Sequence, residues 1–368
     1  DVGYGCHDPL HYVPDSISYF HTIRVAVHFM DAESGDKNFS KTAGKKYMRQ
    51  LIADANKKLL NNKKMNLPVG NDTPNLNPKF RYQITPYTED PTDDGFYWHY
   101  DDDLFAFIHK GRYRNNYKKD VIRKYALKQD SIINIFILPH HPDSVLTTTY
   151  KPKITGIALG TSLKMSGLYE NPNKPWLAST LLNHEVAHIL GLNHSWISND
   201  GCDDTPPNDN CWETTGVSPC DGIISNNLMD YNNQQSAITP CQLGKIHRGF
   251  AMQYYKSRKL VEPVWCEPDL KNPIIIKEDV QWYGARDINR NILIEENASL
   301  ILTCRVSMAK DTRITIRTGG KLVLFNVELH NACGDEWLGI FKEKRGGKEA
   351  AVEVYGASSI SDVRKSLE

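Results

Sequence analysis

The chain has 368 residues, which is long enough for two domains and a large hydrophobic core. It carries 44 Lys and Arg against 44 Asp and Glu, and 40% of its residues are hydrophobic. This balance gives no sign of a nucleic acid or an anionic membrane as partner. No apolar run approaches the roughly 18 residues of a membrane-spanning helix. The sequence opens on Asp1 without a charged and apolar leader, so we expect that any signal peptide has been removed.

The first half of the chain alternates predicted strands and helices. Four short apolar or alternating segments rich in β-branched residues predict strands, at 22–30, 80–84, 131–138 and 154–159. The third of them is almost wholly apolar, as in a strand buried on both faces. Apolar residues at helical spacing predict helices over 45–60 and over 104–126, with a break near Gly111. This order indicates an α/β layer.

Two polar segments lie between these elements. Residues 61–79 are rich in Asn, Pro and Lys and predict a long loop. Residues 85–103 are acidic and contain a run of aromatic side chains from Phe96 to Tyr100. We interpret them as a solvated acidic loop with its aromatic side chains turned inward, although a ligand-binding loop is an alternative.

The helix expected around residues 181–190 carries histidines at the spacing of metal ligands. His184 and His188 stand four apart and therefore share one helical face, within reach of one ion. Gly191 ends the helix because glycine adopts left-handed dihedrals without steric cost, and His194 then turns back as a third ligand. Three imidazoles leave a fourth position open for water, as in catalytic zinc sites. Glu185 lies beside this face and is the candidate general base.

The spacing H-E-x-x-H-x-x-G-x-x-H is that of the metzincin zinc peptidases, so the chain resembles this class. A second element supports the resemblance. Residues 226–231 resemble the Met-turn of the class, with Met229 beneath the metal and Tyr231 two residues further on.

Within this class the chain looks like the pappalysin family over about residues 17–258. The resemblance rests on the first and third predicted strands, the zinc helix and a downstream motif with spaced cysteines: Cys202-Asp203-Asp204-Thr205-Pro206, Cys211, Cys220 and Cys241. One departure is Ala187, which stands where the family usually has glycine. Because alanine is the better helix former, we expect little effect.

The resemblance implies an α+β catalytic domain, in which a twisted mixed sheet and the active-site helix lie above an irregular C-terminal subdomain. A substrate peptide would add to the edge strand near 154–159, an arrangement that supplies backbone hydrogen bonds to any sequence. Family precedent pairs Cys202 with Cys220 and Cys211 with Cys241. The oxygen donors of one Pro-rich loop suggest a calcium site, with a solvated turn as the alternative: Asp203, Asp204, Thr205 and Asp209.

These residues predict a secreted zinc endopeptidase acting on protein or peptide substrates. Zinc would lower the pKa of its bound water to about 7, and Glu185 would accept the proton and pass it to the leaving amine. Tyr231 would hydrogen-bond the developing oxyanion, and Met229 would form the floor of the metal site. Two other functions stay open. One is a zinc-retaining binding or adhesion protein, and the other is a zinc hydrolase of non-peptide amides or an exopeptidase.

Eight cysteines without a C-x-x-C pair predict disulfides and an oxidising compartment, so we expect a secreted, periplasmic or cell-surface protein. Eight cysteines allow 105 connectivities, and the sequence alone does not choose among them. Cys6 either bridges to Cys266 or another C-terminal cysteine, or places its thiolate on the zinc as a short latency segment.

The last hundred residues differ in kind and follow a Pro-marked linker predicted at 263–273. The pairs Ile292-x-Ile294 and Leu300-x-Leu302 recur at an offset of 22, and Val352-x-Val354 repeats the pattern once more. A fixed period of short strands suggests a β-solenoid, and a small β-sandwich is the alternative. No catalytic constellation is visible there. The predicted organisation is a lead-in at 1–16, a catalytic domain at 17–262 and a β-rich accessory domain at 263–368.

Overall fold

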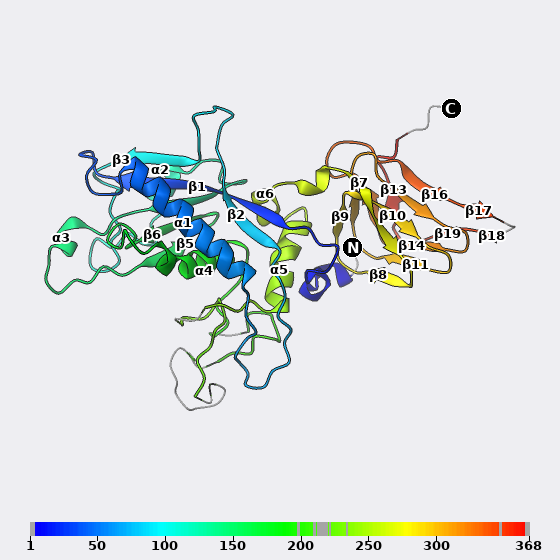
Figure 1. Cartoon of the computed structure of the whole chain (residues 1–368), viewed down its shortest axis with the longest axis horizontal. Helices are drawn as coiled ribbons and strands as arrows, with labels where there is room; N and C mark the ends of the chain where they lie inside the picture. Colours follow the sequence, from blue (N-terminus) through cyan, green and yellow to red (C-terminus); the bar gives the residue numbers. More distant parts are fainter. Residues whose placement is uncertain are drawn as a thin grey trace. The chain divides into compact units, whose positions relative to one another are not determined.

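The structure is a computed structural model, and it describes residues 4–196, 199–208, 211, 220, 222–232, 235–345 and 348–364. The chain divides into two units, whose elements are labelled in Figure 1. The N-terminal unit comprises 20–249 and 254–262, and the C-terminal unit comprises 1–19, 250–253 and 263–368. The segment 1–16, predicted to stand apart as a lead-in, is thus grouped with the C-terminal unit. None of the helices in the described ranges combines the length and apolarity needed to cross a membrane.

The N-terminal unit contains a six-stranded mixed sheet in the order β2-β1-β4-β6-β5, with β3 also paired to β1. All strand pairs are parallel except β5 with β6, which is antiparallel. β5 ends the sheet, as predicted for the edge strand, and all five residues of β4 are buried, as predicted for a central strand. The strands are β1 (His21–Asp31), β2 (Phe80–Ile84), β3 (Phe96–Tyr100), β4 (Ile133–Ile137), β5 (Thr155–Ala158) and β6 (Ser162–Ser166).

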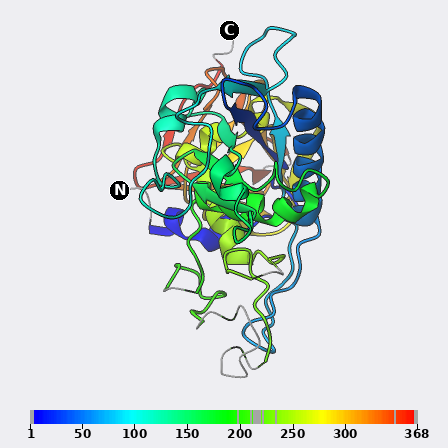
Figure 2. The ribbon, with the colours of Figure 1, turned by 90° about the vertical axis from the view of Figure 1, so that its left-hand side faces the viewer.

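Helix α1 begins after Ser40, whose side chain caps it, and buries one apolar stripe. It packs against α4, the helix that carries the histidine motif, and against β2 (Figure 1 and Figure 2). The α-helices of this unit, with the end of α5 assigned to the other unit, are α1 (Lys41–Leu60), α2 (Asp120–Tyr125), α3 (Pro142–Val145), α4 (Ser179–Ile189), α5 (Pro240–Ala251) and α6 (Lys256–Leu260). A 3-10 turn, η3 (Pro175–Ala178), leads into α4.

For this unit, one predicted helix was too long, one predicted loop forms a strand, and one strand was not predicted. The helix predicted over 104–126 is only α2, because the preceding segment is folded by side chain to backbone bonds: Asn115 accepts from the Ile108 amide at 2.9 Å and donates to the Ala106 carbonyl at 2.8 Å. The aromatic run expected in a loop forms β3, and β6 was not predicted. Both strands depend on partners distant in sequence, which local pattern does not reveal.

A pair of histidines, His28 fully buried and His99 half-buried, links three strands of the sheet. His28 in β1 contacts His99 in β3 through Nδ1 and Nε2 at 2.9 Å, and its Nε2 lies 2.9 Å from the Asn134 side-chain oxygen. Burial, with a smaller electrostatic contribution from His99, lowers the pKa of His28 to about 3. Burial also lowers the pKa of His99 to about 4. Both rings are therefore neutral when the protein is folded at neutral pH.

This pair predicts a loss of stability in acid. Unfolded histidine binds its proton near pH 6.5 while the folded pair does not, so the free energy of unfolding should be highest above pH 6.5 and fall towards pH 3–4. Each such site contributes a slope of up to about 1.4 kcal/mol per pH unit. Chemical denaturation of the wild type and of His28→Gln between pH 4.5 and 6.5 measures that slope. A slope that is unchanged in His28→Gln would refute this origin.

The C-terminal unit is built from three parallel four-stranded sheets, and successive strands along the chain join the three sheets in turn. Their strand orders are β16-β13-β10-β7, β19-β14-β11-β8 and β20-β15-β12-β9, and β17 and β18 form a hairpin. The strands are β7 (Asp269–Ile276), β8 (Val280–Trp282), β9 (Arg286–Ile288), β10 (Arg290–Ile294), β11 (Ser299–Leu302), β12 (Val306–Met308), β13 (Arg313–Ile316), β14 (Lys321–Phe325), β15 (Glu328–His330), β16 (Gly339–Lys342), β17 (Lys344–Arg345), β18 (Lys348–Glu349), β19 (Ala351–Tyr355) and β20 (Ser359–Ile360). Three 3-10 turns also belong to it: η1 (Tyr4–His7), η2 (Pro9–Tyr12) and η4 (Val264–Cys266).

The 22-residue offset found in the sequence matches the pairing of neighbouring strands in these sheets. Ile292 pairs with Ile314 and Leu300 with Leu322, and the inward side chains of successive turns form one apolar core. The prediction of a linker at 263–273 was wrong, because η4 and the first residues of β7 lie within this range. β7 ends its sheet, and an end strand tolerates Pro273, which has no amide hydrogen to donate.

All eight cysteines form disulfides, and the pairing taken from family precedent was wrong. The pairs are Cys202–Cys241 and Cys211–Cys220 in the N-terminal unit, and Cys6–Cys304 and Cys266–Cys333 in the C-terminal unit. The first two pairs have Cα separations of 5.6 and 5.4 Å, within the range that a disulfide spans. Cys6 is therefore bridged to a C-terminal cysteine other than Cys266, and it is not a zinc-bound latency thiolate.

Candidate active site

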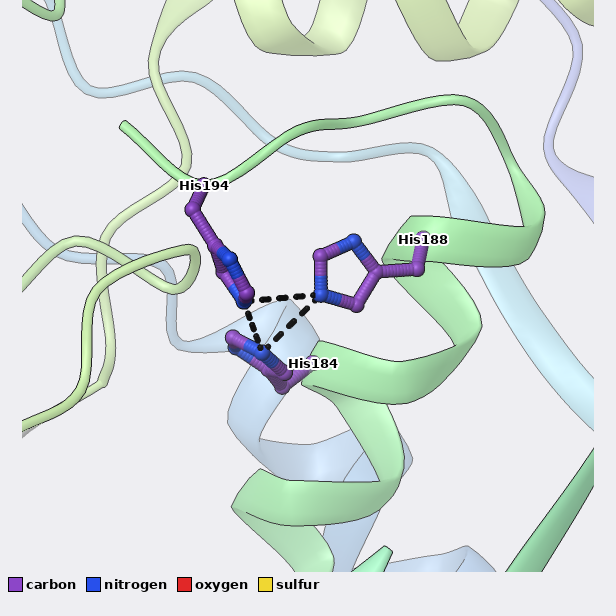
Figure 3. A group of neighbouring side chains, drawn as sticks. All are labelled: His184, His188 and His194. Carbon is purple, nitrogen blue, oxygen red and sulfur yellow. Dashed lines mark hydrogen bonds between the residues drawn. The ribbon is translucent and has the colours of Figure 1, made fainter. Parts of the chain in front are cut away.

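The three motif histidines converge on one point (Figure 3). His184 and His188 project from the same face of α4, while Leu182 and Val186 on the other face are buried. Gly191 follows the helix with φ at +99°, a conformation that favours glycine, and the chain turns so that His194 faces the helix. The Nε2 atom of His188 lies 3.2 Å from that of His184 and 3.1 Å from that of His194, and the third separation is 3.3 Å.

Two of the rings are oriented by main-chain carbonyls. The Nδ1 atom of His184 lies 2.7 Å from the Leu228 carbonyl oxygen, and Nδ1 of His188 lies 2.8 Å from the Leu192 oxygen. A carbonyl only accepts, so each Nδ1 must carry the proton and each Nε2 must present a lone pair. Burial lowers the pKa of all three rings, to about 3 for His184 and about 4 for His194, so neutral rings are favoured.

Neutral imidazoles whose lone pairs face each other repel unless a cation lies between them. A tetrahedral zinc site with Zn–N bonds of about 2.0–2.1 Å has N–N separations of about 3.3 Å, and the three separations here are 3.1–3.3 Å. Three nitrogen donors with carbonyls behind two of them are also the usual zinc environment. The residues present therefore fit a zinc ion.

The predicted Met-turn adjoins this centre, because its Leu228 carbonyl accepts the hydrogen bond from His184. Met229 is fully buried, and its amide donates to the Asn227 side-chain oxygen at 2.8 Å. Asn227 also exchanges hydrogen bonds with Gln242 in α5, at 3.0 and 3.1 Å. Ser195, directly after the third histidine, donates to the buried Asp230 carboxylate at 2.7 Å. Sequence reasoning gave these polar side chains no role. Ser195 and Asp230 stand beside His194 and Met229, whereas Gln242 is distant from both in sequence.

Glu185 lies next to the histidines and is held by the edge strand. Its side chain is 7% exposed, and its Oε2 accepts a hydrogen bond from the Ala158 amide of β5 at 2.7 Å. Burial raises the pKa of this carboxyl to about 7, and the Ala158 hydrogen bond opposes that rise. Gly156, two residues earlier, permits the close approach: a Cβ there would lie 3.1 Å from Glu185 Cγ. Neither Gly156 nor Ala158 was identified from the sequence.

Tyr231 is placed beside the histidine cluster, as its position after the Met-turn suggests. Its ring centre lies 4.7 Å from that of His194 and 5.9 Å from that of His184, and the residue is 49% exposed. Burial raises the pKa of its hydroxyl, with smaller electrostatic contributions from Glu185 and Tyr117. The hydroxyl is therefore protonated and able to donate at neutral pH.

The residues predicted to bind calcium have other partners. Asp204 accepts from the Thr239 hydroxyl at 2.7 Å and from the Cys241 amide at 2.9 Å, at the start of α5. Thr205 donates to Asp200 at 2.8 Å, and Asp203 is exposed. Asp209 lies outside the described residues. Calcium binding by this loop therefore stays a prediction.

Comparison with known proteins gives only distant likeness. No protein-family model matches the chain, and no curated protein sequence matches it either. Among solved structures, it is similar to mirolysin in complex with a compound, at 17% identity and a TM-score of 0.45, over 66% of this chain and 96% of that one. It is also similar to mature mirolysin of Tannerella forsythia with a cleaved peptide, at 18% identity and a TM-score of 0.41, over the same shares. A promirolysin variant of that organism gives 17% identity and a TM-score of 0.43, over 68% of this chain and 87% of that one. At this level of similarity, the comparison assigns neither a family nor an activity to the chain.

Proposed function

We propose that this chain is a zinc-dependent endopeptidase of the metzincin class, similar to the pappalysins. The observation that carries the proposal is the convergence of three Nε2 atoms within 3.1–3.3 Å of one another, with the Glu185 carboxyl on the next residue of the same helix. A structural zinc site would use four protein ligands, whereas three histidines leave the fourth coordination position open for water or substrate. Cleavage of a quenched-fluorescent peptide library by zinc-loaded protein, lost on chelation and restored by zinc, tests it.

Zinc held by His184, His188 and His194 would act as a Lewis acid, which makes water acidic at neutral pH and polarises a carbonyl. Glu185 would then take a proton from the attacking water and deliver it to the leaving amine. The Ala158 amide keeps one carboxylate oxygen in place, which leaves the other to accept that proton. The protonated hydroxyl of Tyr231 would donate to the oxygen on which charge develops.

The substrate is proposed to be a polypeptide in an extended conformation. β5 is the end strand of the sheet, and it carries the amide that holds the catalytic carboxyl. A peptide added to this edge would form backbone hydrogen bonds whatever its sequence, which suits cleavage within a chain.

The four disulfides favour an oxidising location, so we propose a secreted, periplasmic or cell-surface enzyme. The C-terminal unit is proposed to be a β-solenoid, because its parallel sheets repeat about every 22 residues. Its described residues contain no group of three or more side chains placed to hold a metal. We propose that it governs where the enzyme acts or which large substrate it meets.

Replacing one ligand should remove the metal. His188→Ala leaves two imidazoles, which rarely hold zinc, so zinc content should fall from about one per chain to below about 0.1 after dialysis. Peptide cleavage should disappear, and zinc should no longer raise the melting temperature, since an ion stabilises only a fold that binds it. Elemental analysis and thermal unfolding measure both, with the exposed His7→Ala as control. Retention of stoichiometric zinc by His188→Ala would contradict the proposed ligand set.

A further inference from the structure

One loop of the N-terminal unit carries a cluster of basic side chains. Residues 109–119 contain no acidic residue and five basic ones, Lys110, Arg112, Arg114, Lys118 and Lys119, in a chain whose net charge is zero. All five are exposed. The neighbouring carboxylates of Asp120 and Asp101 pair instead with Arg123 and Lys124, and within the described residues none of the five has an ion-pair partner.

The loop is held in one conformation by buried contacts. Lys164 of β6 is 2% exposed, and its ammonium donates to the Asn115 carbonyl at 2.7 Å and to the Lys118 carbonyl at 2.8 Å. The side chain of Asn115 bonds the main chain at Ile108 and Ala106, which closes the loop on itself. The basic side chains therefore project from a fixed backbone, which limits the entropy lost when they bind an anion.

These side chains surround a hollow that is also lined by a buried side chain with an unsatisfied hydrogen-bond acceptor. Lys110, Arg112, Arg114 and Tyr117 line it together with Asn116. Asn116 is 6% exposed, and its side-chain oxygen has no hydrogen-bond partner in the described part of the protein. A buried acceptor without a donor is unfavourable, so this position favours a ligand that brings an N–H or O–H group.

The hollow lies on the side of the edge strand opposite to the catalytic helix. Gly156 and Ala158 face α4 and Glu185, whereas Ile157 between them packs against the cluster that includes Phe105 and Phe107. Ile157 is the register partner of Lys164, the residue that anchors the basic loop. A peptide lying along β5 would therefore pass between the histidine cluster and the hollow.

We propose that this basic hollow binds acidic side chains of the polypeptide substrate and so selects substrates with Asp or Glu near the scissile bond. The inference rests on the proposed peptidase function. An acidic peptide supplies both groups that the hollow lacks, carboxylates for the unpaired cations and an amide hydrogen for Asn116. Tyr113 and Tyr117, 71% and 63% exposed, support the cations, because the Arg112 and Arg114 guanidinium groups lie over their rings at 5.8 and 5.5 Å from the ring centres.

The test compares peptides that differ only in charge. Quenched peptides of one scissile sequence carry three Glu on one side of the cleaved bond, three Glu on the other side, or three Gln. Wild type should cleave one acidic peptide with a kcat/KM about tenfold above that of the Gln peptide, and the ratio should shrink at 0.5 M salt. The triple variant Lys110→Ala/Arg112→Ala/Arg114→Ala should lose the ratio. The control triple variant Lys41→Ala/Lys46→Ala/Lys57→Ala removes equal charge from exposed positions of α1 and should keep it.

Binding supplies a readout that does not depend on cleavage. In the Glu185→Ala background, fluorescence anisotropy should show about tenfold weaker binding of the preferred acidic peptide when the loop triple variant is added, and less than twofold when the α1 triple variant is added. Equal cleavage and equal binding of all three peptides by wild type would overturn the inference and leave the peptidase function standing. If the wild type binds the acidic peptide through the loop but does not cleave it, the result would support the hollow as a binding site and reject the peptidase function. Loss of heparin binding by the loop variant with no charge preference among peptides would assign the hollow to a polysaccharide and contradict the proposal.

Discussion

Replacing Glu185 by alanine is expected to lower kcat for peptide cleavage by about 10³-fold while zinc content and fold are retained. Proton transfer by a positioned carboxylate is worth about 10²–10⁴-fold in rate. The carboxyl lies beside the histidines without belonging to the group of three side chains that could hold the metal. Its removal deletes a proton acceptor and leaves the ligands untouched.

The measurement is single-turnover cleavage of a peptide by protein whose zinc content has been determined in the same sample. Glu185→Ala should hold about one zinc per chain and melt within a few degrees of wild type. If zinc-loaded Glu185→Ala cleaved the peptide at the wild-type rate, Glu185 would have no part in the mechanism. Loss of zinc from this variant would make it a ligand, and the division between metal binding and proton transfer would be wrong.

The histidine site was predictable because its signals are local. A helix places residues four apart on one face, and glycine after the helix permits one defined reversal, so His184, His188 and His194 were identified before any contact was known. Glu185 followed from the same helix. The site's other supports are distant in sequence: the Leu228 carbonyl behind His184 and the Ala158 amide on Glu185. Backbone groups have no residue-type signature, so no sequence pattern points to them.

The sheets show the same distinction between local and distant determinants. The buried strand β4 is apolar except for Asn134 and was recognised, whereas β3 carries mixed aromatic and polar side chains and becomes a strand only by pairing with β1. In the C-terminal unit, the 22-residue spacing of Ile292 and Ile314 revealed the repeat. The first turn of this repeat, which begins with β7, was not recognised, because β7 contains Pro273 and follows a proline-rich segment. The disulfide pairs depend on separations in space, which spacing in the chain does not determine.

Gly156→Ala is expected to lower kcat by about 10–100-fold without touching the metal. An added Cβ would lie 3.1 Å from Glu185 Cγ and 3.3 Å from the Leu181 side chain, closer than such atoms normally pack. The carboxyl must therefore shift, and its 2.7 Å hydrogen bond from the Ala158 amide must lengthen. Small misplacements of a reacting group cost up to about 10²-fold in rate. Zinc content and KM for a short peptide should stay within twofold of wild type, which separates a misplaced base from a damaged substrate edge.

A double-mutant cycle decides whether Gly156 acts through Glu185. In the Glu185→Ala background the Cγ atom is gone, so adding Gly156→Ala should change the residual kcat by less than about twofold. The coupling would then equal almost the whole effect of the single variant, as expected for two residues that act as one unit. An equal loss in both backgrounds would show instead that the methyl group disturbs Leu181 or the pairing of substrate with β5. In that case Gly156 would belong to peptide binding, and the position of Glu185 would have to be set by the Ala158 amide alone.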